Sequence, residues 1–225
     1  MNRLGRFLFE DGTPYPLAVF RMAFAGVLFV SALSFLPDAH RFFSAEGILP
    51  NRVLTLTQPD PYVSLLHLAD SPAVVGGFFA VYLTAVVCLF LGIATRPVTV
   101  VLFVLHVSLR NRNPLVMDTG EQLQGIVLFW LLFADSARVL SLDALRRGGD
   151  DGRPGNPVWV WRMLQIQLCF VYGGSLISKL VDPDWVSGTT MFHVVALIPD
   201  WRIPLPFLLD QPALLRAVTW GTLLF

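Results

Sequence analysis

The chain has 225 residues, of which 55% are hydrophobic and only 14% are charged, whereas soluble domains carry about 25% charged residues. This composition excludes a disordered chain and argues against a soluble globular protein. Because 16 Lys and Arg residues balance 16 Asp and Glu residues, the sequence has no basic surface for nucleic acid and predicts no nucleic-acid partner. Among the cations only Lys179 is a lysine, and all the others are arginines.

Apolar residues are concentrated in runs long enough to cross a membrane, which predicts an all-α, polytopic transmembrane helical bundle. The first run is too long for a signal peptide and is interpreted as a retained helix. We expect five complete spans and a truncated sixth, so that residues 1–225 form a single domain of a longer protein that continues beyond Phe225. The expected spans are 17–36, 73–95, 98–109, 119–134 and 158–180, with the sixth beginning near Ala213.

The distribution of arginines predicts the orientation in the membrane. The loop 138–153 holds four arginines, and positively charged loops stay in the cytoplasm. Although the total cations on the two sides are equal in number, this cluster favours a cytoplasmic N-terminus, in the plasma (inner) membrane if the source is bacterial. The helix ends with Arg110, Glu121 and Lys179 would then be extracytoplasmic. Arg21, about one turn inside the first span, is interpreted as an arginine that snorkels to the interface.

The fifth span carries a stripe of polar residues on one helical face. Ionisable groups that face lipid are costly, so such a stripe faces the bundle interior or a wet cavity. It is either a packing seam with Lys179 snorkelling to the interface or a functional surface. A desolvated lysine, unlike an arginine, can give up its proton and act as a base, so Lys179 is the candidate catalytic residue. The stripe consists of Arg162, Gln165, Cys169, Tyr172, Leu176 and Lys179.

A second polar group lies where the third span ends and the fourth begins. His106, Arg110 and Asn113 are spaced four and three residues apart, and Glu121 follows at the entrance to the next span. This group is either a polar cap at the membrane surface or the lining of a site for an anionic or quinone-type ligand. In a site, Arg110 would be the cation, and Asn113 or Glu121 would be hydrogen-bonding partners. No histidine pair has the spacing of metal ligands, so no metal is expected.

Four segments carry a family resemblance through their order and spacing: 42–50 (FFSAEGILP), 106–114 (HVSLRNRNP), 133–143 (FAD, then SLD) and 167–188 (QLCFVY, SKL and DWVSG). Together they resemble the horizontally transferred transmembrane (HTTM) domain family, whose best-known member is the vitamin K-dependent gamma-glutamyl carboxylase. The similarity extends over nearly the whole chain.

The resemblance implies a function for Lys179, which matches the lysine that deprotonates reduced vitamin K in the carboxylase. Reaction of that quinol with oxygen drives carboxylation of a substrate glutamate, which is a carbon–carbon lyase and epoxidising chemistry. The expected cofactor is therefore a reduced, vitamin K-like quinone, and the expected partners are membrane lipids, the quinone and a peptide or protein substrate. Tyr172, Asp184 and Trp185 would line the site. A histidine near the start of the carboxylase's fourth helix has no match at 118–122.

Two other classes of function remain open. In the first, the same stripe lines the cavity of a non-catalytic ligand-binding or transport module, and Lys179 is a fixed positive charge. In the second, the chain is a purely structural bundle that anchors or pairs with another protein. The substitution Lys179→Arg separates a base from a fixed charge, because arginine keeps its proton.

Overall fold

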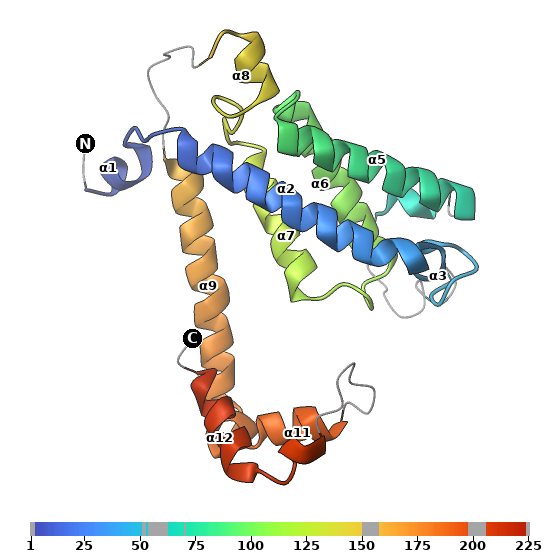
Figure 1. Cartoon of the computed structure of the whole chain (residues 1–225), viewed down its shortest axis with the longest axis vertical. Coiled ribbons are helices and arrows are strands. Elements are labelled where there is room, and N and C mark those ends of the chain that lie inside the picture. The colour runs from blue at the N-terminus through green and yellow to red at the C-terminus, as the bar shows by residue number, and fades with distance from the viewer. Residues whose placement is uncertain are drawn as a thin grey trace. The chain divides into compact units, whose positions relative to one another are not determined.

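The computed structural model describes residues 3–50, 53, 63–69, 71–149, 158–197 and 206–223. Within these ranges all regular structure is helical (Figure 1), which confirms the all-α prediction. The chain divides into two compact units, Met1–Leu164 and Gln165–Phe225. The end of the predicted sixth span at Phe225 and residues 150–157 of the polar loop before the fifth helix lie outside the described residues.

Unit 1 is built around four long helices that follow one another in the chain, with short helices at their ends. The four are α2 (Tyr15–Phe35), α5 (Pro72–Leu91), α6 (Thr95–Arg112) and α7 (Thr119–Leu131). The shorter elements are α1 (Arg3–Phe9), η1 (Leu36–Asp38), α3 (Ala39–Phe43), η2 (Leu65–His67) and α8 (Leu142–Arg146), and the start of α9 (Trp159–Val181) completes the unit.

The four long helices, here called the bundle, pack side by side in the order α2, α5, α6 and α7. They alternate in direction. Arg21, in the first half of α2, contacts the segment that follows α7, while Arg112, at the end of α6, contacts the segment that follows α3. The buried core between the helices is apolar and includes Leu28, Val75, Phe79, Leu102 and Leu128.

The helix α5 ends at a glycine, Gly92. Gly92 has a left-handed conformation (φ 70°), and the Ile93 amide donates to the Cys88 carbonyl at 2.9 Å, which is the usual way a glycine ends a helix. A Cβ atom at Gly92 would collide with Ser141. The second span therefore ends at Leu91 rather than at residue 95, and α6 begins at Thr95.

Three helical segments in the described residues are long and apolar enough to cross a membrane: Tyr15–Phe43, Pro72–Leu91 and Trp159–Val181. The prediction of five complete spans is therefore wrong by this measure, although all five predicted segments are helices. The helix α6 is not one of the three segments because it carries too many charges, namely Arg96, Arg110 and Arg112. The helix α7 has 13 residues, about 20 Å at a rise of 1.5 Å per residue, whereas the hydrocarbon core is about 30 Å thick.

Unit 2 contains the rest of α9 followed by α10 (Pro183–Ser187), α11 (Thr190–Leu197), η3 (Pro206–Leu208) and α12 (Pro212–Gly221). The helix α12 packs against α10 and α11. Gly188 follows α10 with φ 79°, and a Cβ atom there would collide with Arg216. The Trp220 indole donates to the Val186 carbonyl at 3.3 Å, so a hydrogen bond also ties α12 to α10.

Candidate functional site

Lys179 lies near the end of α9, and its amine is 4.8 Å from the ring centroid of Trp185. Local sequence explains this contact. Asp182 caps α10 by accepting a hydrogen bond from the Asp184 amide at 2.8 Å, and Pro183 occupies the first turn, where its missing amide hydrogen costs nothing. The chain therefore turns directly after α9 and brings Trp185 against the amine, a cation–π arrangement.

Two carboxylates, Asp182 and Asp184, follow Lys179 closely in the chain, and Asp184 is engaged by other residues. Asp184 Oδ2 lies 3.4 Å from His193 Nδ1 on α11, and the Thr189 hydroxyl donates to Asp184 Oδ1 at 3.3 Å. Within the described part of the chain, Lys179 makes no ion pair. The amine thus lies against an aromatic ring.

His193 was not among the predicted site residues, yet it is the residue that pairs with Asp184. Sequence spacing gives no signal for this pair, because the two residues lie on different short helices joined through the left-handed turn at Gly188. With Nδ1 directed at the carboxylate, the other ring nitrogen of His193 is available to a ligand or to water.

Tyr172 lies on α9, two helical turns before Lys179, which is about 10 Å along the axis. The spacing of seven residues places both side chains on one face of the helix. Unit 2 thus brings Lys179, Asp184 and Trp185 into one cluster, called the Lys179 cluster below, and places Tyr172 on the same helix. The predicted role of each residue in binding or catalysis stays a prediction.

Arg110, Asn113 and Glu121 belong to unit 1, so the structure does not relate them to Lys179. Arg110 is exposed. Asn113 is fully buried; its side-chain amide donates to the Phe42 carbonyl at 2.8 Å and its oxygen accepts from the Leu115 amide at 3.1 Å. Asn113 therefore ties α3 to the turn that follows α6, and its predicted role as a ligand-binding residue remains a prediction.

Arg112, the neighbour of Asn113, explains why two of the four resemblance segments occur together. Its guanidinium donates to the Leu49 carbonyl at 2.9 Å and to the Ser44 carbonyl at 2.7 Å. Gly47 lies between these acceptors, where a Cβ atom would collide with the Arg41 carbonyl. The segment 106–114 thus supplies the donors and the segment 42–50 supplies the acceptors of one buried contact.

Glu121 forms a capping box with Asp118 at the start of α7. The Asp118 amide donates to Glu121 Oε2 at 3.1 Å, and the Ser31 hydroxyl of α2 contacts Oε1 at 3.3 Å. A side-chain hydrogen bond with Glu121, together with hydrogen bonds donated by the Gly120 and Glu121 amides, lowers the pKa of Asp118. The Glu121 carboxylate therefore has a structural role, which is compatible with the surface-cap interpretation of this group.

His106 is buried between two helices of the bundle. Its Nε2 lies 2.8 Å from the Glu121 carbonyl oxygen, which can only accept, so Nε2 carries the proton. In the neutral ring Nδ1 then accepts from the Tyr82 hydroxyl at 3.2 Å. His106 thus links α5 to α7 through α6.

The interpretation of Arg21 as a snorkelling arginine is wrong. Its side chain is fully buried and donates to the Ser136 carbonyl at 2.6 Å and to the Leu140 carbonyl. These acceptors lie in the resemblance segment 133–143, so this segment is also held by a buried arginine. Snorkelling assumes that the nearest polar partner is water, whereas here the partners are main-chain oxygens.

Comparison with known proteins identifies the family. A model of the HTTM domain matches residues 9–225. Searches of curated proteins and of solved structures gave no match. Because the family model covers nearly the whole chain, and the apolar helices are those of a membrane protein, the chain belongs to the HTTM domain family.

Proposed function

We propose that the chain is the membrane domain of an enzyme related to the vitamin K-dependent carboxylase, in which Lys179 takes a proton from a quinol-type, lipid-soluble substrate. The observation that carries this proposal is that, in the described residues, the amine has no carboxylate partner, since Asp182 and Asp184 are engaged elsewhere. A carboxylate partner would stabilise the protonated amine. Without one, a bound apolar ligand that displaces water favours the neutral amine, which is the form that acts as a base.

The residues of the Lys179 cluster fit a reduced quinone in chemical type. A quinol supplies an acidic hydroxyl group and reducing equivalents when it is bound. Trp185 and Tyr172 offer aromatic faces for stacking on its ring, and Lys179 offers the group that accepts the hydroxyl proton. A peptide or protein glutamate as the second substrate rests on the family resemblance alone.

The test is the oxidation of reduced menaquinone by oxygen, catalysed by the purified chain in lipid vesicles. Lys179→Arg and Lys179→Gln are both expected to lower the rate by about 100-fold or more, because general-base catalysis typically contributes that much. Arg41→Lys, at an exposed position on α3, is the control and should leave the rate unchanged. Full activity of Lys179→Arg would show that the residue is not a base.

A second candidate function is a non-catalytic ligand-binding or transport module. The observation that favours it is the same contact with Trp185, because a cation–π arrangement stabilises the charged amine. In this case Lys179 is a fixed cation that binds an anionic ligand. Lys179→Arg would then retain ligand binding or transport and Lys179→Leu would lose it, whereas a base is lost in both substitutions.

We further propose that the N-terminus is cytoplasmic and the Lys179 end of α9 extracytoplasmic. The arginines of the segment that follows α7 support this orientation, because cations near membrane helices are retained in the cytoplasm. In unit 1 this segment lies at the same end of the bundle as the start of α2, since Arg21 contacts the Ser136 carbonyl.

A further inference from the structure

Two adjoining cavities lie at the end of unit 1 where α2, α6 and α9 begin. The larger has a volume of about 440 Å³, within the range of small-molecule sites, about 300–1,000 Å³. The smaller has a volume of about 280 Å³. The two cavities share three lining residues, Arg96, Ala134 and Asp135, so a ligand that occupies both would lie against these residues. None of the lining residues belongs to the Lys179 cluster.

The larger cavity has aromatic walls. Trp159 and Trp161, in the first turn of α9, and Phe133, after α7, line it. The Trp159 ring packs against Phe133, with ring centroids 6.1 Å apart, and the Trp161 ring packs against Phe20 of α2 at 5.5 Å. The helix α9 is one of the three segments of membrane-spanning length. Because tryptophans at the end of such a helix favour the level of the lipid head groups, the cavity lies at that level.

Arg96 and Asp135 bring opposite charges to both cavities. Arg96 lies in the first turn of α6, Asp135 follows α7, and both residues are exposed. Within the described ranges of the chain, neither side chain forms an ion pair or a hydrogen bond. The cavity walls therefore offer one free cation and one free anion to the same ligand.

The other two charged residues that line the smaller cavity, Asp143 and Arg147, already have partners. Asp143 Oδ2 accepts a hydrogen bond from the Ala94 amide at 2.7 Å. The Arg147 guanidinium donates to the Ala137 carbonyl at 3.0 Å. These contacts fix α8 and its neighbour Arg147 as part of the wall, so the selection of a ligand by charge rests on the other pair.

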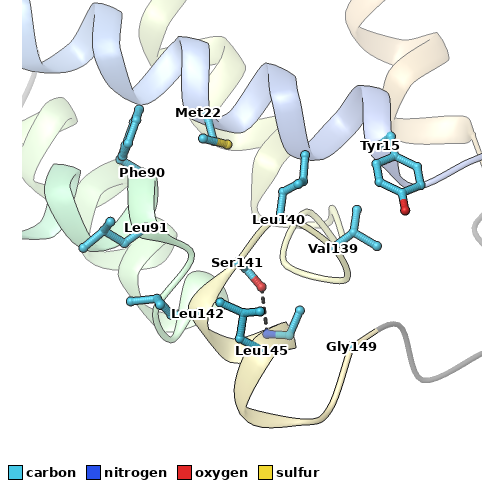
Figure 2. A pocket seen from close by; sticks show the side chains of 11 residues that line it. Tyr15, Met22, Phe90, Leu91, Val139, Leu140, Ser141, Leu142, Leu145 and Gly149 are labelled. Atoms are coloured by element: carbon cyan, nitrogen blue, oxygen red, sulfur yellow. Dashed lines mark hydrogen bonds between the residues drawn. The ribbon is translucent and has the colours of Figure 1, made fainter.

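A third cavity of unit 1, of about 450 Å³, lies where α2 begins and α5 ends (Figure 2). Its lining is largely apolar, and the described lining residues include no charged side chain. Ser141, one of its few polar residues, caps α8 by accepting from the Ala144 amide at 2.9 Å. This cavity can take an apolar group, but it has no charge with which to distinguish one head group from another.

We propose that the two adjoining cavities bind the head group of phosphatidylethanolamine. The phosphate pairs with Arg96, the primary ammonium group pairs with Asp135, and the apolar part of the lipid lies against Trp159 and Trp161. Charge complementarity selects this occupant. An anionic lipid without an amine leaves Asp135 unpaired, and the quaternary ammonium of phosphatidylcholine has no N–H to donate to a carboxylate. The proposal is independent of the function proposed for Lys179.

The first test compares two lipids that have the same net charge and differ in the head-group amine. Phosphatidylethanolamine and phosphatidylcholine with the same acyl chains are titrated onto the delipidated full chain in detergent, and bound lipid is measured by native mass spectrometry. The expected affinity for phosphatidylethanolamine is about fivefold higher, the effect of one ion pair with an exposed carboxylate. Equal affinities, or tighter binding of phosphatidylcholine, would overturn the proposal.

Two substitutions test the two charges separately. Asp135→Ala should abolish the preference for phosphatidylethanolamine, whereas Asp38→Ala, at an exposed position near the other end of the bundle, should retain it. Arg96→Gln should weaken binding of both lipids about fivefold, because a cation near the phosphate is lost, whereas Arg41→Gln, exposed on α3, should not. A preference that survives Asp135→Ala, or unchanged affinities in Arg96→Gln, would contradict the assignment.

The same variants are checked for folding without lipid. The thermal unfolding midpoints of Asp135→Ala and Arg96→Gln should equal that of the wild type, because neither side chain has a partner in the described residues. The wild-type comparison of the two lipids needs no substitution, so it decides even if a variant is destabilised.

A last measurement separates a lipid from a free head group. Phosphatidylethanolamine gains free energy by covering the aromatic walls in addition to its ion pairs. O-Phosphoethanolamine in large excess should therefore fail to displace the bound lipid in the same assay. Displacement would show that the soluble head group is sufficient and would overturn the lipid as the occupant.

Discussion

Two buried arginines, Arg21 and Arg112, hold connecting segments at opposite ends of the bundle. Each is fully buried and donates through two nitrogens to two main-chain carbonyls. A guanidinium suits this task because its donors form a rigid planar fork and its hydration is weaker than that of an ammonium group. A lysine has one terminal nitrogen, which cannot reach two carbonyls in the same geometry.

We therefore expect Arg112→Lys to destabilise the protein although it keeps the charge. The loss should be about 1–3 kcal/mol, the cost of leaving a buried polar group without a partner. Thermal or denaturant unfolding of the purified chain in detergent measures it. Arg110→Lys is the matched control two residues earlier on α6, exposed, with an expected change within about 0.5 kcal/mol. Equal effects of the two substitutions would contradict the assigned role of Arg112.

At the scale of the helix, the start of α7 depends on its capping box. Asp118 Oδ1 accepts from the Gly120 amide and, at 3.3 Å, from the Glu121 amide. Another aspartate in the same position relative to its helix, Asp38 before α3, makes no such side-chain bond. The two residues therefore form a matched pair in which one aspartate caps its helix and the other does not.

Asp118→Ala is expected to raise amide hydrogen exchange in the first turn of α7 roughly fivefold, as is typical of a lost helix cap, whereas Asp38→Ala should change little at α3. Because the Glu121 side chain and the capping amides lower the pKa of Asp118, the contribution of the cap is complete at neutral pH and is lost only as the pH falls through that lowered value. Asp118→Asn keeps an acceptor and should remove this pH dependence. Unchanged exchange in Asp118→Ala would disprove the assignment.

The helices themselves could be predicted from hydrophobic runs, but the partners of the polar residues could not. The predicted spans 17–36, 119–134 and 158–180 correspond closely to α2, α7 and α9. Arg21 and Asn113, in contrast, donate to main-chain carbonyls. Every residue has a carbonyl, so the sequence gives no sign of which one will be the acceptor, and a buried structural donor resembles a ligand-binding group.

The cluster around Lys179 shows which part of a site can be predicted. Lys179, Asp184 and Trp185 are close in sequence, and the turn at Asp182 and Pro183 brings them together by local geometry. The pair of Asp184 with His193 depends on how α11 packs after Gly188, which no spacing rule describes. Local contacts were therefore predictable and contacts between separate short helices were not.

At the scale of the whole molecule, the family model spans residues 9–225 while the structure divides after Leu164. Within unit 1 the two ends of the bundle are well distinguished. The Val158 amide donates to the Glu10 carbonyl at 3.1 Å and Arg21 contacts Ser136, so the N-terminal segment and the segment after α7 share one end. The loop from Ser44 to Leu49, held by Arg112, lies at the other.

This arrangement predicts which positions are accessible from the same face of a membrane. In a chain whose Cys88 and Cys169 are replaced by alanine, Glu10→Cys and Asp135→Cys should react with a membrane-impermeant thiol reagent only in inside-out vesicles. Glu46→Cys should react only in right-side-out vesicles. All three native side chains are exposed carboxylates, and acidic residues contribute little to orientation, so the substitutions leave the arginine signal intact. Labelling of Glu10→Cys and Asp135→Cys from opposite faces would contradict the fold of unit 1, whereas labelling of all three with the faces exchanged would contradict only the cytoplasmic assignment.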